Sequence, residues 1–250
     1  MQKEYNMNIH VAKNAEDLGL RAAAKIASVL REAIAERGSA RLLLSTGASQ
    51  FETIAALIKE DVDWSKVEAF NLDDYVGIDE NHKASFRKYL KDRFASKVSL
   101  KNSFFVDTEG DVNAKIAGLT KEMGKAPIDL GVIGIGENAH IAFNDPPADF
   151  KTNETYFVVT LDEKCKQQQV REGWFETVAD VPSEAITITP NAIMKCRHLI
   201  SSVPHRVKAE AVYNTLTSKL NPDIPATLLK THPSWHLYLD VESSAKIFPV

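Results

Sequence analysis

Two kinds of hydrophobic pattern alternate along the chain. Short continuous apolar runs, such as residues 41–45 and 128–133, are typical of strands that are covered on both faces. Between such runs, apolar residues recur at helical spacing, first at Ile26, Val29, Leu30, Ala33 and Ile34. This alternation of strands and helices predicts an α/β fold of Rossmann-like type, with a doubly wound, mostly parallel sheet flanked by helices.

The remaining elements follow from the same patterns. We expect strands at residues 8–11, 41–45, 67–71, 103–106, 128–133, 156–161, 185–189, 198–203 and 235–239. Helices are expected after Asn14, near residues 51–58, 86–94 and 111–123, after residue 204 and, briefly, after the last strand. Asn14 can cap the first helix, with Asp17 three residues later completing a capping-box-like pair.

Domain organisation is expected to be simple. The chain has no internal repeat, low-complexity linker or break in composition, which indicates one domain over residues 1–250. From residue 148 to residue 180 the periodicity is lost, apart from the strand at 156–161. Because this segment adjoins the candidate site, we interpret it as a lid; a surface excursion without function is the alternative.

Four groups of polar residues stand where predicted strands end. They are Thr46–Ser49, Asp73 with Asp74, Asn138–Asp145 and His205–Lys208. In doubly wound sheets, ligands bind in the crevice at the carboxyl ends of the strands. The four groups therefore predict a single site.

The first and last groups favour an anion. Thr46, Gly47, Ala48 and Ser49 form a tight strand-to-helix turn, in which free backbone N–H groups and two hydroxyls can hold a phosphate. The turn lacks the Gly-Lys-Ser/Thr ending of a Walker loop, and simple helix capping is the alternative interpretation. The basic residues of His205–Lys208 open a helix, where they oppose the helix dipole unless an anion lies there.

The middle groups favour acid–base chemistry. Of the neighbours Asp73 and Asp74, one is expected to face inward as a single buried base, and a solvated turn is the alternative. The loop at residues 131–147 carries His140 among amides and carboxylates, and two prolines end it before a long helix can form. A polar connection with a structural histidine is the alternative there.

Composition narrows the function classes. The net charge of −4 argues against nucleic acid as a partner, and no apolar run approaches the roughly 18 residues of a membrane helix. The N-terminus lacks the apolar core of a secretion signal. Cys165 and Cys196 have no metal or redox spacing, so a reducing, cytoplasmic setting is expected.

Three other functions deserve comparison. Residues 134–139 match G-x-G-x-x-A, but a dinucleotide site needs a helix directly after the glycines. Asp73, Asp74, His140 and Asp145 could hold a metal, yet they include one histidine and no H-x-x-x-H or cysteine pair, so we expect no metal. A sugar-phosphate-binding regulator would keep the phosphate loop and Lys208 and lose the acid–base groups.

Three motifs resemble the glucosamine-6-phosphate deaminase family, which is related to the 6-phosphogluconolactonases. They are Ser45-Thr-Gly-Ala-Ser49, Phe70-Asn-Leu-Asp-Asp-Tyr-Val-Gly77 and Gly134-Ile-Gly-Glu-Asn-Ala-His-Ile-Ala-Phe-Asn-Asp-Pro146. The resemblance runs over most of the chain, and the segment Ile141-Ala-Phe-Asn favours the deaminases.

The resemblance implies a cofactor-free conversion of glucosamine 6-phosphate to fructose 6-phosphate and ammonia, in amino-sugar catabolism. It implies that Asp73 is the base and that His140 assists ring opening, with Asp145 and Asn138 orienting the histidine. It also implies that the phosphate is held by Ala48 and Ser49, in the turn that begins with Thr46 and Gly47, and by Lys208, at the start of a later helix. A lactonase-like hydrolase or an isomerase of another amino-sugar phosphate is the alternative. Assembly into a homo-oligomer stays open.

The sequence departs from the family pattern at several positions. Where this chain has Asp145 and Asp74, the family commonly has glutamate. Where it has Asn138, some members have aspartate, and Ala139 replaces a usual glycine. The shorter Asp145 is expected to need a closer backbone or a bridging water to reach the imidazole. Ala139 is expected to be strained if its φ is positive. The phosphate-binding arginine of the family's flap has no clear counterpart, since Arg171 stands in a different register. These changes leave the substrate and catalytic power open.

Overall fold

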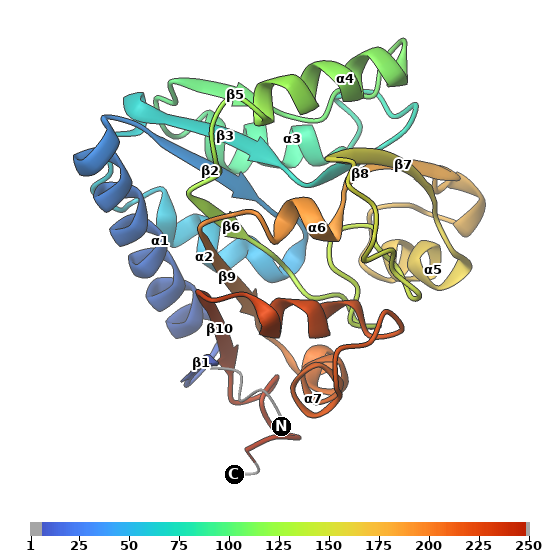
Figure 1. The fold of residues 1–250 in the computed structure, drawn as a ribbon. Coiled ribbons are helices and arrows are strands. Elements are labelled where there is room, and N and C mark those ends of the chain that lie inside the picture. The colour runs from blue at the N-terminus through green and yellow to red at the C-terminus, as the bar shows by residue number, and fades with distance from the viewer. Residues whose placement is uncertain (1–6, 249–250) are drawn as a thin grey trace.

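The computed structural model describes residues 7–248, in which a seven-stranded sheet forms the centre (Figure 1). All neighbouring strands of this sheet are parallel, in the order β1-β10-β9-β6-β2-β3-β5. In that order the strands are Asn8–Ala12, Trp235–Asp240, His198–Val203, Leu130–Val132, Ala40–Leu44, Val67–Asn71 and Asn102–Phe104. The prediction of a doubly wound, mostly parallel sheet is confirmed.

Helices cover both faces of the sheet. The helices are α1 Ala15–Arg37, α2 Phe51–Leu57, α3 Phe86–Leu90, α4 Val112–Met123, α5 Glu163–Arg171, α6 Pro190–Ile193 and α7 Ala209–Thr217. Helices α1, α2 and α3 pack in one buried cluster, and α4, α6 and α7 contribute to a second. In β2, Leu42 and Leu44 join the first cluster and Leu43 the second, because successive side chains of a strand point to opposite faces.

The first helix begins as its sequence predicts. The Asn14 side chain accepts a hydrogen bond from the Asp17 N–H at 2.8 Å, and the Asp17 carboxylate accepts from the Lys13 N–H at 3.1 Å. The helix ends at Gly38, which adopts the left-handed conformation (φ 75°) that a C-terminal glycine supplies without a Cβ clash. Local chemistry thus sets both ends of the longest helix among the described residues.

A second sheet lies beside the carboxyl ends of the main strands. It is antiparallel, in the order β4-β8-β7, and consists of Asp73–Tyr75, Glu184–Ile188 and Tyr156–Thr160. The strands expected at 156–161 and 185–189 are therefore present, but neither belongs to the parallel sheet. In Figure 1, α5 lies next to β7 and β8.

Two local expectations were wrong. The segment 148–180 was expected to be irregular apart from its strand, yet it contains the helix α5. Asp162 caps the start of this helix, where its side chain accepts a hydrogen bond from the Cys165 N–H at 2.6 Å. Its buried residues include Gln168 and Gln169, so the helix lacks an apolar stripe. After β10, residues 241–247 form turns rather than a short helix. There the Asp240 carboxylate accepts from the Ser243 N–H at 2.7 Å.

Within residues 7–248, no helix combines the length and the apolar character needed to cross a membrane.

Candidate active site

A cavity of about 420 Å³ opens at the carboxyl ends of β2, β3, β6 and β9. Residues from all four predicted polar groups line it, so the fold brings the four groups to one cavity. The predicted site residues in its wall are Thr46, Gly47, Ala48, Ser49, Asp73, His140 and Lys208. The other two, Asn138 and Asp145, are not in the wall but contact His140 from behind.

The turn after β2 forms the first part of the wall. Gly47 has a φ of 97°, a conformation that glycine adopts without the strain of a Cβ, and a 3₁₀ turn at Ala48–Gln50 leads into α2. The Tyr89 hydroxyl donates to the Gly47 carbonyl at 2.9 Å and holds the turn from the side of α3. The turn therefore presents a fixed backbone and the Thr46 and Ser49 hydroxyls to the cavity.

Asp73 stands where β3 passes into β4 and is 5% exposed. Burial, followed by the negative charge of Asp74, raises the pKa of the Asp73 carboxyl well above its usual value, although a hydrogen bond from the Phe143 backbone opposes the shift. A carboxylate with a raised pKa is a stronger base, and its wall position lets it reach a bound molecule.

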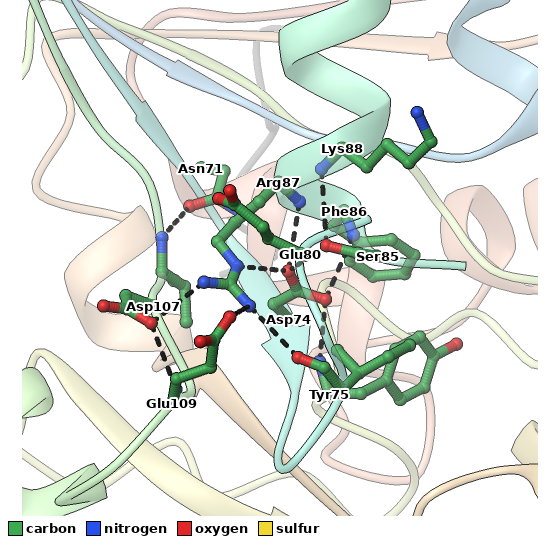
Figure 2. A network of polar contacts seen from close by, with 12 residues as sticks. Asn71, Asp74, Tyr75, Glu80, Ser85, Phe86, Arg87, Lys88, Asp107 and Glu109 are labelled. Carbon is green, nitrogen blue, oxygen red and sulfur yellow. Dashed lines mark hydrogen bonds and ion pairs between the residues drawn. The ribbon is translucent and has the colours of Figure 1, made fainter. Parts of the chain in front are cut away.

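Asp74 points the other way and is fully buried. Its carboxylate accepts hydrogen bonds from the backbone N–H groups of Tyr75, Phe86 and Arg87 at 2.9–3.0 Å, from the Ser85 hydroxyl at 3.1 Å and from the Arg87 guanidinium at 3.4 Å (Figure 2). This carboxylate fixes the start of α3 against β4. The prediction that one of the two aspartates faces the site is confirmed.

Two residues without a predicted role support this arrangement. Asn71 donates to the Asp73 carbonyl at 2.8 Å and accepts from the Val106 N–H at 2.7 Å, so it fixes the backbone beside the carboxylate. Arg87 also pairs with Asp107 at 2.9 Å and Glu109 at 3.3 Å, as Figure 2 shows. Asn71 belongs to a motif of the sequence, whereas the contacts of Arg87 become visible once distant segments are folded together.

The loop after β6 positions the histidine. His140 Nδ1 lies 3.1 Å from Asp145 Oδ1, and Asn138 donates to the same oxygen at 3.0 Å. The Asn138 side-chain oxygen accepts from the His140 N–H at 3.1 Å. The shorter Asp145 thus contacts the imidazole directly, so no bridging water is needed. A carboxylate at Nδ1 favours the tautomer whose Nε2 can accept a proton.

The charge of Asp145 is favoured by its neighbours. Burial by itself raises the pKa of this carboxyl, but the hydrogen bond and charge of His140, then Asn138 and Cys165, outweigh burial and leave the pKa lowered. Cys165 belongs to α5, and burial, followed by the charge of Asp145, raises the pKa of its thiol. The helix beside the cavity therefore also contacts the carboxylate behind the histidine.

Backbone conformation explains two small residues in this loop. Ala139 has a φ of 67°, so the strain expected for a residue with a Cβ at positive φ is present. A Cβ on Gly136 would lie 2.3 Å from the His140 ring. Glycine at 136 is therefore required for the histidine to occupy its observed position, a constraint that depends on the folded loop.

Lys208 and α5 complete the wall. Lys208 is 7% exposed. Burial lowers the pKa of its ammonium, although the negative charges of Glu172 and Glu137 act to raise it. Arg171, at the end of α5, also lines the cavity and pairs with Glu137 at 2.8 Å. From its position in the sequence, this arginine was given no role. The fold nevertheless brings it to the same cavity as Lys208.

The arrangement disfavours a dinucleotide site. The described segment after β6 forms turns at 137–147 instead of the helix that a dinucleotide fingerprint requires. Across residues 7–248, no group of three or more His, Cys, Asp or Glu side chains is arranged to hold a metal ion.

Comparison with known proteins gives consistent matches. Residues 13–237 match the family described as glucosamine-6-phosphate isomerases/6-phosphogluconolactonase. A glucosamine-6-phosphate deaminase of Exiguobacterium sp. is 33% identical over 96% of this chain and 92% of its own length, and one of Staphylococcus epidermidis is 34% identical over 88% and 92%.

Solved structures agree with the fold. A monomeric glucosamine-6-phosphate deaminase is 27% identical, with a TM-score of 0.87 over 96% of this chain and 99% of its own. A 6-phosphogluconolactonase from Shewanella baltica is 19% identical, with a TM-score of 0.77 over 96% and 99%, and shares the fold.

Proposed function

The chain belongs to the glucosamine-6-phosphate isomerase/6-phosphogluconolactonase family, and we propose that it converts glucosamine 6-phosphate and water into fructose 6-phosphate and ammonia. The observation that carries the proposal is the shared cavity, in which Asp73, His140 and the phosphate-type turn face one space. A buried base, an oriented imidazole and an anion site are what an aldose–ketose isomerisation of a sugar phosphate requires.

In the proposed reaction, His140 assists opening of the pyranose ring through its Nε2. Asp145 keeps the proton on Nδ1, and Asn138 holds Asp145 in place. Asp73 then removes the proton from C2 of the open-chain aldose and delivers it to C1, while O1 gains a proton and the amino nitrogen loses one, which produces a 2-imino sugar. Water adds to C2, and ammonia leaves, so fructose 6-phosphate remains.

The phosphate is proposed to lie against Thr46–Ser49 and Lys208. Arg171 is a further candidate, because its guanidinium lines the same cavity and its partner Glu137 is replaceable by a phosphate oxygen. Both groups of this ion pair are partly exposed, so little free energy opposes the exchange.

The deaminase proposal is favoured over a lactonase. The two relatives named as deaminases are 33% and 34% identical, whereas the lactonase structure from Shewanella baltica is 19% identical and supports the fold alone. A regulator that only binds sugar phosphates would not need Asp73 buried beside the cavity or Asp145 behind His140.

We also propose that the chain is one domain and that residues 148–180 act as a lid. The support is that Gln168, Gln169, Arg171 and Trp174, all of this segment, line the cavity. The cytoplasm is the proposed location, because both cysteines are free thiols, as a reducing compartment maintains them.

The test is an ammonia-release assay with glucosamine 6-phosphate, run on the wild type and on Asp73→Asn. We expect ammonia from the wild type and a loss of roughly 10²–10⁴-fold in kcat for the variant, because its amide cannot accept the C2 proton. Retained binding of fructose 6-phosphate by the variant is the control for folding. A wild type that releases no ammonia contradicts the proposed reaction, and a fully active variant contradicts the role of Asp73.

A further inference from the structure

Gln169 of α5 carries a side-chain amide that the protein itself does not use. The residue is 6% exposed and lines the cavity. Its backbone carbonyl accepts from the Trp174 N–H at 3.1 Å, but within residues 7–248 its side chain makes no hydrogen bond. The amide is nevertheless not sealed inside the protein, unlike the unpartnered hydroxyls of Ser45 and Ser202. A mostly buried polar group that borders a cavity and is unpaired there indicates a partner that enters with the ligand.

Three glutamines follow one another in α5, and each has a different environment. Gln167 is exposed and does not line the cavity. Gln168 is buried and lines it, but its amide donates to Glu172 at 2.7 Å, and that carboxylate also accepts from the Trp174 indole at 3.0 Å. Gln169 is therefore the glutamine of α5 whose amide is left for a ligand.

The position of Gln169 along α5 indicates which part of a ligand it meets. Cys165, four residues earlier and thus on the same face of the helix, contacts Asp145, the carboxylate behind the histidine. Glu172, three residues later on that face, lies close enough to Lys208 for its charge to act on the lysine pKa. Gln169 thus lies between the acid–base groups and the proposed phosphate position, about one helical turn, roughly 5 Å, from each of the two flanking residues.

The chemistry of the amide selects the group that it binds. In the proposed substrate, C1 and C2 react at one end and the phosphate is attached to C6, so the carbons between them carry hydroxyl groups. A primary amide offers two donors and an acceptor, and a hydroxyl group can both accept and donate, whereas a phosphate oxygen only accepts. A hydroxyl therefore satisfies both ends of the Gln169 amide.

We propose that Gln169 is a specificity-determining residue, whose side-chain amide forms hydrogen bonds with the hydroxyl at C3 or C4 of the sugar phosphate. The inference rests on the proposed function for the identity of that sugar phosphate. A site that pairs a buried amide with a ligand hydroxyl discriminates against an analogue that lacks the hydroxyl, because the amide is then left unpaired. Gln169 therefore selects sugar phosphates that carry a hydroxyl at this position.

Gln167 provides a matched control. It is the same residue type in the same helix, but its side chain is exposed and lies outside the cavity. Methionine has nearly the length of glutamine and a similar helix propensity, but it lacks the amide. Of the two replacements by methionine, only the one at Gln169 removes a polar group that borders the cavity.

The experiment measures, by calorimetry, binding of inorganic phosphate, fructose 6-phosphate and its 3-deoxy and 4-deoxy analogues to the wild type, Gln169→Met and Gln167→Met. We expect Gln169→Met to weaken fructose 6-phosphate by roughly threefold to tenfold, the usual effect of losing a neutral hydrogen bond, and to leave inorganic phosphate unchanged. One deoxy analogue should bind the wild type more weakly than fructose 6-phosphate does and show no such loss in Gln169→Met, because both changes remove the same interaction. Gln167→Met should match the wild type with every ligand.

Each other outcome has a definite meaning. A loss for inorganic phosphate equal to that for fructose 6-phosphate overturns the inference, because the amide would then contact the phosphate. An unchanged affinity in Gln169→Met, an equal loss in Gln167→Met, additive losses with both deoxy analogues, or a wild type that does not bind fructose 6-phosphate also overturns it. A wild type that binds fructose 6-phosphate but releases no ammonia contradicts the proposed reaction, while the deoxy comparison still decides the role of Gln169.

Discussion

His140 depends on the absence of a side chain at Gly136. A Cβ there would lie 2.3 Å from ring atoms Nε2 and Cε1, far inside van der Waals contact, and the loop holds the ring from the other side through Asp145. The imidazole is therefore confined between a glycine and a carboxylate. Sequence motifs can indicate such a glycine, but the reason for it lies in the folded loop.

This confinement predicts the effect of Gly136→Ala. The methyl group should displace the imidazole, and displacement of a catalytic group by about 1 Å can reduce activity roughly 10²-fold. Ammonia release should therefore fall by about that factor, with a smaller change in fructose 6-phosphate affinity. The control is Gly118→Ala in α4, where a Cβ meets nothing within 4 Å and full activity is expected. Undiminished activity of Gly136→Ala would contradict the confinement.

At the scale of elements, three neighbouring strands carry histidines on the side that faces α1. His10 of β1 and His236 of β10 approach each other, with Nε2 of one 3.4 Å from Nδ1 of the other. His198 of β9 is hydrogen-bonded to Ser234 through Nδ1 at 2.7 Å. Lys25 lies close enough for its charge to lower the pKa of all three, with burial as the largest cause.

These histidines predict a loss of stability in mild acid. Burial, followed by the charges of Lys25 and His10, lowers the pKa of His236 from 6.5 to about 4. The unfolded chain therefore binds more protons than the folded one between these values, so stability is complete above pH 6.5 and is lost as the pH falls toward 4. The urea midpoint should decrease from pH 7.5 to pH 5, and His236→Gln should reduce the decrease. An equal decrease in both proteins would contradict the assignment to His236.

At the scale of the whole molecule, the cavity joins segments that are far apart in the sequence. Its wall runs from Ser45 after β2 to Lys208 after β9 and includes Arg171 of α5. The unfolded chain has no such cavity. A ligand that binds in it therefore stabilises the folded chain relative to the unfolded one.

Ligand binding is therefore expected to raise the unfolding temperature. Fructose 6-phosphate at about 100 times its Kd should add ~2.7 kcal/mol, which corresponds to roughly 5–10 °C in a chain of this size. Unphosphorylated fructose at the same concentration is the control and should produce little shift, because it lacks the group for Ser49 and Lys208. Equal shifts with both sugars, measured by scanning fluorimetry or calorimetry, would contradict a phosphate site in the cavity.

The extent of prediction differs between regions for physical reasons. The parallel sheet, the capped first helix and the four polar strand ends were predicted correctly, since hydrophobic period and capping chemistry are local properties. The helix α5 was missed because Gln168 and Gln169 occupy its buried face where apolar residues are expected. Its place beside the cavity was not encoded in a periodic pattern.

The sequence by itself determined the fold class, the residues that meet at the strand ends and the resemblance to a family, because these depend on short-range patterns and motifs. Tertiary structure alone decided that Asp73 faces the cavity while Asp74 binds the start of α3, that Asp145 touches His140 directly, and that Arg171 and Ser45 join the wall. The physical reason is that burial and contacts between distant segments exist only once the chain is folded.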